Sequence, residues 1–276
     1  MYALKARNLS KSYRSSKGAV KVLSDVNLKI ARGEMAAIMG PSGSGKTTLL
    51  HVLTGVDIPD SGKVEIGNRD FTGSTQEEAA RFRREHMGMI FQDFQLLESL
   101  TVKENILLPL ILSQRLSRQS PNGHASMSAW LVARGNKREA SEQEEALEKV
   151  MGELGITELA DKGMDELSGG QKQRVAIGRA LINEPEIIFG DEPSGSLDRK
   201  TTGDVMKCMV QMNRKFGTTF LLVTHDVYAA SFCDRVLLLQ DGKLECEVKK
   251  QGSNAAFRED ILKMWCHLGG EQDDIL

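Results

Sequence analysis

The sequence predicts an α/β fold in which helices cover a parallel β-sheet. Short apolar runs without polar alternation recur along the chain, as is typical of strands buried on both faces of a parallel sheet. Segments with helical spacing of apolar residues separate these runs, and such an alternation of strands and helices indicates parallel pairing. A glycine-rich loop at residues 40–47 also joins one apolar run directly to a helix.

The expected elements follow in chain order. The first thirty residues contain two strand-like segments separated by a turn-rich stretch at residues 14–18, and a buried strand comes next. The expected strands are Tyr2–Leu9, Val20–Ile30, Met35–Met39, Met87–Phe91, Ile187–Phe189, Phe220–Val223 and Val236–Leu239. The expected helices around them are Thr47–Leu53, Gln171–Ile182 and Thr202–Lys215.

The middle of the chain, about residues 95–166, has no strand-like run and is predicted to be an inserted helical subdomain. Residues 141–154 within it are charged and carry apolar residues at helical spacing. Residues 113–138 contain five basic residues and no acidic residue. A solvated loop is the simpler interpretation of that stretch, and a contact with a membrane surface or a partner is the alternative.

The last segment, residues 251–276, is expected to form a tail with an amphipathic helix. Its apolar residues are spaced so that they share one helical face, namely Phe257, Ile261, Met264, Trp265 and Leu268. Packing of this face onto the rest of the domain is the simpler interpretation, and contact with a partner is the alternative.

Composition argues against several classes of protein. The chain has 276 residues, of which 40% are hydrophobic and 27% are charged, as in ordinary globular proteins. Its formal net charge of −2 argues against nucleic-acid binding, because duplex binders usually carry a strong basic excess. The longest apolar run, Ile106–Leu112, is too short to span a membrane, and the N-terminus lacks the apolar core of a signal peptide. The four cysteines show no CxxC spacing, so we expect a cytoplasmic protein with reduced thiols.

The glycine-rich loop fits the phosphate-binding pattern GxxxxGK[ST] in full. Glycines let the backbone approach phosphate closely, and the helix that follows adds the positive end of its dipole. Lys46 supplies a full charge to the β- and γ-phosphates, and the Thr47 hydroxyl can bind Mg²⁺. The residues expected to hold the nucleotide here are Gly40, Pro41, Ser42, Gly43, Ser44, Gly45, Lys46, Thr47 and Thr48.

Two further buried runs end in residues that suit nucleotide hydrolysis. The run EIIFGDE ends in two carboxylates, at the edge of a parallel sheet where ligands bind. Asp191 is placed to hold Mg²⁺ and Glu192 to accept a proton from the attacking water, unless both only cap the next turn. His225 follows the run that ends at Val223 and could orient the water at the γ-phosphate, although a lone histidine is usually structural.

A second glycine signature, LSGGQ, lies at residues 167–171. Locally it starts a helix, because Ser168 can be the N-cap and Gln171 can close a capping box three residues later. Gly169 and Gly170 leave bare backbone N–H groups beside the cap, which also suits an anion.

Taken in order, GPSGSGKT, FQD at residues 91–93, LSGGQ, EIIFGDE, SGSLD and THD resemble the motif set of ABC-type ATPases over about residues 1–250. The resemblance implies an ATPase domain with a RecA-like P-loop core, an antiparallel β edge subdomain and the inserted helical subdomain. It also implies that ATP and Mg²⁺ are bound and that two copies stack head to tail. Each ATP would then lie between the phosphate loop of one copy and the LSGGQ of the other.

The same resemblance implies roles for single residues. Gln92 would contact Mg²⁺ and the water, and would report the nucleotide state to the helical subdomain. Asp198 would line the dimer interface, and Tyr13 would stack on adenine unless it is an ordinary strand-end tyrosine. The γ-phosphate of the partner's ATP would be bound by Ser168, Gly169, Gly170 and Gln171.

Because the chain has one phosphate loop and no expected membrane span, the resemblance implies an ATPase subunit that works with a separate multi-spanning permease, on the inner face of the cell membrane. The segments GVDIPDSGKVEI and FQDFQLLESLTVKENILLPL resemble the group that includes lipoprotein-release and macrolide-efflux ATPases. Residues 226–233, 257–261 and 268–270 resemble the bacitracin-resistance type of antimicrobial-peptide transporter, which often works with a sensor histidine kinase.

Other classes of ABC ATPase fit less well or stay open. A DNA-repair ATPase would need a long coiled-coil insertion, and a translation factor would carry two ATPase units in one chain. This chain has one phosphate loop and a short insertion. A signalling module, whose ATP cycle reports peptide to a kinase without moving it, would use the same site as a transporter and stays open.

Overall fold

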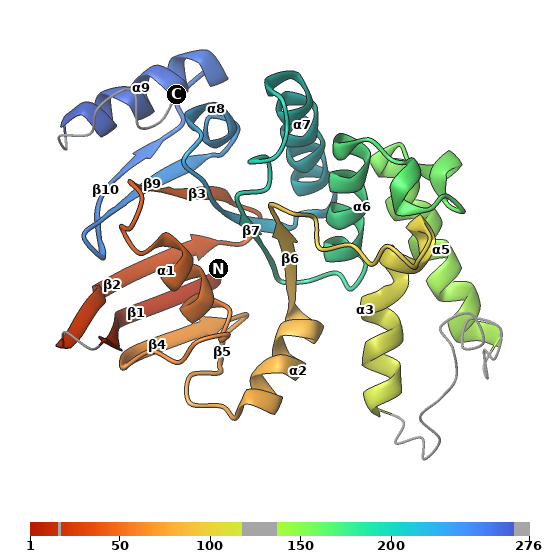
Figure 1. The fold of residues 1–276 in the computed structure, drawn as a ribbon, viewed down its shortest axis with the longest axis horizontal. Helices are drawn as coiled ribbons and strands as arrows, with labels where there is room; N and C mark the ends of the chain where they lie inside the picture. The colour runs from red at the N-terminus through yellow and green to blue at the C-terminus, as the bar shows by residue number, and fades with distance from the viewer. Residues whose placement is uncertain (16–17, 118–136, 268–276) are drawn as a thin grey trace.

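The structure is a computed structural model, and it describes residues 1–15, 18–117 and 137–267. An antiparallel sheet lies at one side of the molecule, a group of helices lies at the other side, and a second sheet extends from the first side to the centre (Figure 1). No helix within these ranges is long and apolar enough to cross a membrane. Most of the basic stretch predicted at residues 113–138 and the predicted face residue Leu268 lie outside the described residues.

A six-stranded sheet in the order β10-β9-β3-β8-β7-β6 forms the centre of the molecule. Strands β9, β3, β8, β7 and β6 pair in parallel, and β10 pairs antiparallel with β9. Both β3 and β8 are buried at every position, which confirms the α/β fold predicted from uninterrupted apolar runs. The strands are β3 (Met35–Met39), β6 (Met87–Phe91), β7 (Ile187–Asp191), β8 (Thr219–Val223), β9 (Arg235–Gln240) and β10 (Lys243–Lys249).

A four-stranded antiparallel sheet in the order β2-β1-β4-β5 lies beside it. The two long N-terminal strands were expected from the sequence, whereas β4 and β5 were not. Only Val64 and Ile66 are buried in β4, so this strand offers a short apolar pattern. The strands are β1 (Tyr2–Ser15), β2 (Gly18–Ala31), β4 (Ser61–Ile66) and β5 (Arg69–Asp70).

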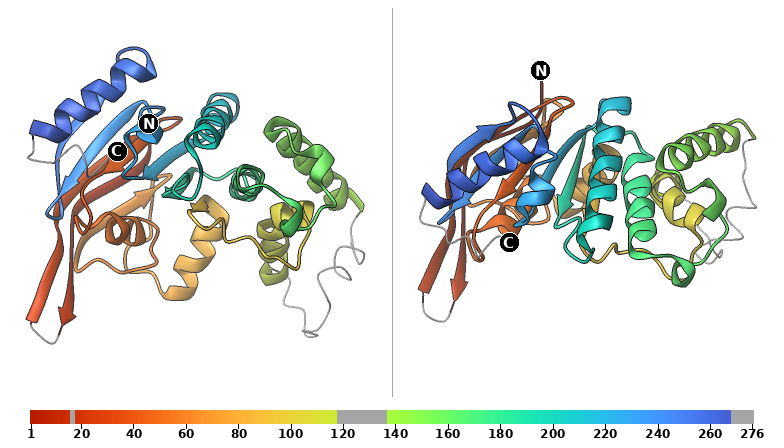
Figure 2. Two further views of the ribbon diagram at one scale, coloured as in Figure 1. Left: turned by 45° about the horizontal axis from the view of Figure 1, so that its top comes forward. Right: turned by 90° about the horizontal axis from the view of Figure 1, so that it is seen from above.

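Helices flank both sheets, and three of them gather at one end of the molecule. There α3, α5 and α6 pack on one another around Ile106, Leu154 and Ile177 (Figures 1 and 2). The helices are α1 (Lys46–Leu53), α2 (Gln76–His86), α3 (Val102–Ser117), α5 (Lys137–Leu154), α6 (Gly169–Leu181), α7 (Arg199–Phe216), α8 (Val227–Ala230) and α9 (Asn254–His267). Two 3₁₀ turns, Thr157–Leu159 and Met164–Glu166, lie between α5 and α6.

The last helix, α9, lies against β10 and α8 (Figure 2). Three of the five apolar residues expected on one face, Phe257, Ile261 and Trp265, are at most 2% exposed. Met264 is partly buried against the same core. The tail helix is therefore joined to the main hydrophobic core through this face.

Candidate functional site

The glycine-rich loop joins the carboxyl end of β3 to the N-terminus of α1. Gly43 and Gly45 have positive φ angles of 79° and 101°, and Gly45 is the N-cap residue of α1. A Cβ atom at Gly45 would lie 3.0 Å from the carbonyl oxygen of Val22 on β2. Gly242 of the β9–β10 turn donates its N–H to the Ser44 carbonyl at 3.1 Å, and a Cβ at Gly242 would lie 2.2 Å from the same Val22 oxygen. The loop is thus packed against β2 and hydrogen-bonded to the turn that β2 also contacts.

The side chains of the loop fit a phosphate group. Ser44 Oγ is buried and has no hydrogen-bond partner among the described residues. Its hydroxyl could therefore donate to a phosphate bound in the loop. Lys46 Nζ donates to the carbonyls of Gly40 at 2.8 Å and Pro41 at 2.9 Å, so the ammonium lies over the loop. Burial lowers the pKa of Lys46, and neighbouring carboxylates partly offset this effect. A phosphate would add negative charge beside this partly buried ammonium group and favour its charged form.

The two predicted carboxylates lie at the end of β7. Asp191 is the last residue of the strand, and burial raises its pKa, as does the adjacent carboxylate of Glu192. His51 on α1 and Lys46 act in the opposite direction and favour the ionised form. The influence of His51 and Lys46 on this carboxyl group shows that Asp191 lies near α1.

Glu192 joins the ends of β7 and β8. Its Oε1 lies 2.8 Å from His225 Nδ1, and its Oε2 accepts a hydrogen bond from Thr224 Oγ1 at 3.3 Å. The Glu192 side chain is 17% exposed, whereas that of His225 is 60% exposed. The histidine therefore stands on the solvent side of the carboxylate, and its Nε2 remains as the second hydrogen-bonding atom of the ring.

Gln92 follows β6, which pairs with β7 through Phe91 and Asp191. Its side chain lies against the loop after Glu192, because a Cβ at Gly195 would be 3.1 Å from its amide group. The backbone carbonyl of Gln92 accepts a hydrogen bond from Ser196 Oγ at 3.0 Å. The strand order thus gathers Lys46, Gln92, Asp191, Glu192 and His225 at one edge of the central sheet.

Tyr13 reaches this edge from the antiparallel sheet. Its hydroxyl donates to Asp57 Oδ2 at 2.5 Å, and this hydrogen bond raises the pKa of Tyr13. The Thr48 side chain of α1 acts in the opposite direction through a second hydrogen bond, so the tyrosine lies beside the helix that carries Lys46. Tyr13 as a whole is 40% exposed.

The LSGGQ signature starts α6, and its predicted capping box is confirmed. Ser168 Oγ accepts from the Gln171 N–H at 3.4 Å, and Gln171 Oε1 accepts from the Ser168 N–H at 2.9 Å. Gly170, in the first turn of α6, faces α7, because a Cβ at Gly170 would lie 2.7 Å from the Thr201 methyl group. Asp198 is the N-cap of α7 and accepts hydrogen bonds from the Lys200 and Thr201 N–H groups.

The signature and the phosphate loop lie apart within one chain. Among the described residues, no hydrogen bond joins residues 168–171 to residues 40–48. Helices α6 and α1 begin in different parts of the molecule (Figures 1 and 2). The sequence placed both motifs at helix N-termini, and the structure leaves them separate.

A protein-family model described as ABC transporter matches residues 23–195. The chain belongs to the ABC transporter family. It is 41% identical to the bacitracin export ATP-binding protein BceA of Halalkalibacterium halodurans, over 99% of this chain and 100% of that protein. It is 38% identical to the lipoprotein-releasing system ATP-binding protein LolD of Porphyromonas gingivalis, over 88% of this chain and 99% of that protein.

Solved structures of the family share the fold. The cassette MJ0796, dimeric in a post-hydrolysis state with ADP and Pi, is 35% identical, with a TM-score of 0.72 over 90% of this chain and 99% of that one. The ADP form of the cassette MJ1267 is 26% identical, with a TM-score of 0.74 over 98% of this chain and 99% of that one. This chain is therefore a RecA-like ABC ATPase and the ATP-hydrolysing subunit of a transporter.

Two side chains of this ATPase site were not singled out from the sequence. Thr224 donates to Glu192 and could have been found, because it belongs to the same THD motif as His225. Asp57 accepts from Tyr13 across the fold, and no local pattern marks it as a partner of a residue on β1.

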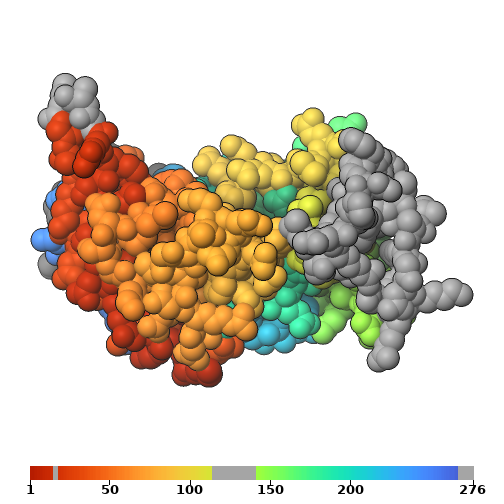
Figure 3. Space-filling view, turned by 90° about the horizontal axis from the view of Figure 1, so that it is seen from below, coloured from red at the N-terminus to blue at the C-terminus, as the bar shows by residue number. Residues whose placement is uncertain are grey.

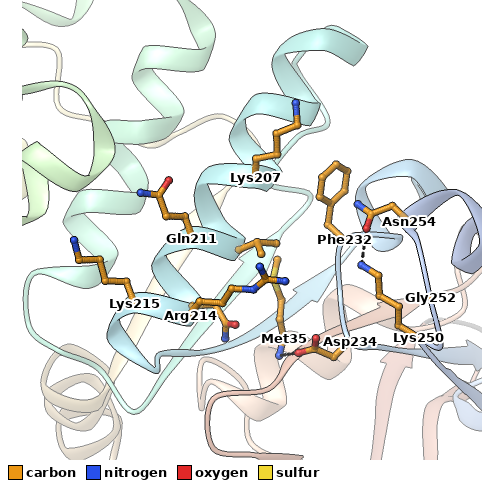
Figure 4. A pocket seen from close by; sticks show the side chains of 12 residues that line it. Met35, Lys207, Gln211, Arg214, Lys215, Phe232, Asp234, Lys250, Gly252 and Asn254 are labelled. Carbon is orange, nitrogen blue, oxygen red and sulfur yellow. Dashed lines mark hydrogen bonds between the residues drawn. The ribbon is translucent and has the colours of Figure 1, made fainter.

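A large cavity of about 850 Å³ lies elsewhere, between α7 and the segment from Lys250 to Asn254 (Figure 4). Its basic residues are Lys207, Arg214, Lys215 and Lys250, and none of the predicted nucleotide residues lines it. Arg214 and Lys215 belong to the last turn of α7, where cations are favoured by the helix dipole. The cavity is thus distinct from the ATPase site.

Proposed function

We propose that this chain binds ATP with Mg²⁺ at the phosphate loop and hydrolyses it with Glu192 as the general base. The single observation that carries this assignment is the 2.8 Å contact between Glu192 and His225 at the strand edge that also carries Lys46. A carboxylate fixed by a histidine can take a proton from a water molecule, and His225 can keep that water in line.

Mg²⁺ fits the side chains that are present. Within the described residues, no group of three or more His, Cys, Asp or Glu could hold a metal by itself. Mg²⁺ commonly uses one or two carboxylates together with substrate phosphates. Asp191, the Thr47 hydroxyl and the Gln92 amide would hold it, and when bound it would neutralise charge on the phosphate oxygens.

A second copy of the chain would complete the site. Helix α6, which the motif residues Ser168, Gly169, Gly170 and Gln171 begin, lies away from α1 in Figure 1, and the relative MJ0796 is dimeric. We assign these residues to the γ-phosphate of the partner's ATP and Asp198 to the dimer interface. ATP would join the two copies, and hydrolysis would separate them.

A groove beside Gln92 suits a separate multi-spanning permease. It has a volume of about 380 Å³ and lies between α2, β6, α3 and α6, on the face shown in Figure 3. Its lining includes Leu108 and Leu112, the latter 39% exposed. Arg179 of α6 donates to the carbonyls of Gln95 at 2.5 Å and Phe94 at 2.9 Å. A partner in this groove would contact both the segment after Gln92 and the helix that begins with LSGGQ.

An antimicrobial peptide is the cargo class we propose. BceA matches 99% of the chain, including the tail, whereas LolD matches 88%. In this arrangement residues 1–250 form the ATPase domain with its helical subdomain at about residues 95–166, and residues 251–276 form the tail. The subunit would lie on the cytoplasmic face of the membrane, with a sensor histidine kinase reached through the permease. Lipoprotein release, macrolide efflux and signalling without transport are the competing functions.

Substitution of the proposed base tests the reaction. Glu192→Gln should slow ATP hydrolysis by about 10²–10⁴-fold, because the amide cannot accept the proton. ATP binding should persist, and an ATP-bound dimer should accumulate in size-exclusion chromatography. Glu158→Gln, an exposed glutamate outside the site, is the matched control and should behave like the unaltered chain. Unchanged turnover in Glu192→Gln would remove Glu192 from the mechanism.

A cell-based measurement separates the competing cargoes. The chain is produced with its membrane partner, identified by pull-down and mass spectrometry, in a peptide-sensitive host. Survival in bacitracin that depends on Glu192 supports peptide transport. Kinase-dependent gene expression without protection supports signalling, and a partner that sorts lipoproteins supports lipoprotein release.

A further inference from the structure

Asp57, in the loop between α1 and β4, connects two side chains of β1. Its Oδ2 accepts from the Tyr13 hydroxyl at 2.5 Å, and its Oδ1 accepts from Lys11 Nζ at 2.7 Å. Lys11 also donates to the Ile58 carbonyl at 2.6 Å, and the Ile58 N–H donates back to Asp57 Oδ1 at 2.8 Å. Both oxygens of the carboxylate are therefore engaged, and the loop is tied to β1.

These contacts restrict the ring of Tyr13 from two directions. The hydroxyl is fixed by Asp57, and Lys11 Nζ lies 5.1 Å from the ring centroid, within cation–π distance. The residue as a whole is still 40% exposed, and a planar group that stacks on the ring would cover part of this surface. The nearby Thr48 places this exposed ring beside the helix that follows the phosphate loop.

We propose that Asp57 is a positioning residue for the nucleotide, and that it holds the Tyr13 ring where the base of ATP stacks. Because Tyr13 is the adenine-contacting residue of the function proposed above, this role of Asp57 rests on that function. A ring that is fixed before binding loses less side-chain freedom when the base arrives, and this lowers the cost of binding.

The charge of Asp57 favours this role. Partial burial raises the pKa of its carboxyl, but hydrogen bonds from Lys11 and Tyr13 outweigh burial and hold the pKa below its usual range. The carboxylate is therefore ionised near neutral pH, and a hydroxyl that donates to a charged acceptor makes a stronger hydrogen bond than one that donates to a neutral acceptor.

The test compares ATP with inorganic tripolyphosphate, which offers phosphates without a base. Asp57→Ala should raise the KM for ATP by about two- to tenfold, the range expected when one side chain loses its fixed position. The kcat at saturating ATP and the Kd for Mg²⁺-tripolyphosphate should each stay within about twofold. Asp57→Asn keeps an acceptor for the hydroxyl and should restore part of the affinity for ATP.

A double substitution tests the coupling between the two residues. Tyr13→Phe removes the donor and keeps the ring, so Asp57→Ala should have little further effect on the KM for ATP in that background. Asp60→Ala, an exposed aspartate in the same loop, is the matched control and should leave all constants unchanged.

Three results would overturn the role of Asp57. They are equal losses of affinity for ATP and tripolyphosphate, full additivity of Asp57→Ala with Tyr13→Phe, and an unchanged KM for ATP in Asp57→Ala. If Asp57→Ala does not fold, the comparison of Asp57→Asn with Tyr13→Phe carries the same test. An unaltered chain that neither binds nor hydrolyses ATP would instead remove the proposed function itself.

Discussion

Glu192 is held in a backbone conformation that few non-glycine residues adopt, with φ at 50°. Its N–H donates to the Val223 carbonyl at 2.9 Å, and this bond to β8 keeps the backbone turned. Such strain persists only where the surroundings enforce it, and it is concentrated at functional sites. The position of Glu192 at a strand end was predictable from the sequence, but its φ angle depends on the neighbouring strand.

Two glycines of the phosphate loop allow a matched test at the same scale. Gly43→Ala should destabilise the protein by about 1–2 kcal/mol, because a Cβ at positive φ is strained but meets no atom within 4 Å. Gly45→Ala adds a clash with β2 and should cost about 1–3 kcal/mol more. Urea denaturation measures both. Equal losses would show that the contact of Gly45 with β2 is unimportant.

At the scale of single elements, α6 and α2 begin with the same capping geometry. Ser168 and Gln171 form one box, and Thr75 and Glu78 form the other, with Thr75 Oγ1 accepting from the Glu78 N–H at 3.3 Å. Loss of either cap should affect its helix in the same way, but only Ser168 is proposed to touch a nucleotide. A comparison of Ser168 and Thr75 variants therefore separates the effect of losing a helix cap from the effect of losing a nucleotide contact.

Ser168→Ala and Thr75→Ala should each lower the free energy of unfolding by about 1 kcal/mol. ATP hydrolysis should fall strongly in Ser168→Ala and remain near normal in Thr75→Ala. Urea denaturation measures the free energy of unfolding, and steady-state assays measure the rate of ATP hydrolysis. A comparable loss of hydrolysis in Thr75→Ala would mean that helix stability, rather than the γ-phosphate contact, explains the effect of Ser168.

The elements missed from the sequence share a physical reason. Helix α2 buries only Ala79, and β10 alternates between exposed and partly buried positions, so neither has the apolar pattern that identified β3 or β8. The capping box Thr75–Glu78 was a usable signal for α2. Helices and strands that are covered on one face only have fewer apolar residues in their sequence than strands that are buried on both faces, so they are harder to recognise.

At the scale of the whole molecule, α9 attaches the end of the chain to the main core. Trp265→Ala should lower the free energy of unfolding by about 3–5 kcal/mol, because the side chain is only 2% exposed and its removal leaves a cavity. Glu259→Ala, at an exposed position of the same helix, should have almost no effect. Similar urea midpoints for the two variants would show that α9 contributes little to the core.

The candidate site was predictable to the extent that it follows local rules. Strand ends of a parallel sheet share one edge, which gave the neighbourhood of Lys46, Asp191 and His225. The hydrogen bond between Asp57 and Tyr13 joins the loop before β4 to β1, which lies far from it in the sequence, and no spacing rule predicts it. The separation of α6 from the phosphate loop likewise depends on how the helices pack.

The strand order also has a consequence for synthesis on the ribosome. Strand β3 pairs only with β8 and β9 in the parallel sheet, and both are encoded late in the chain. Until they emerge, the five buried residues of β3 lack their neighbours, and exposed apolar strands favour aggregation. A nascent chain released before β8 would carry an intact phosphate-loop sequence, yet it could neither close the sheet nor form the pair between Glu192 and His225.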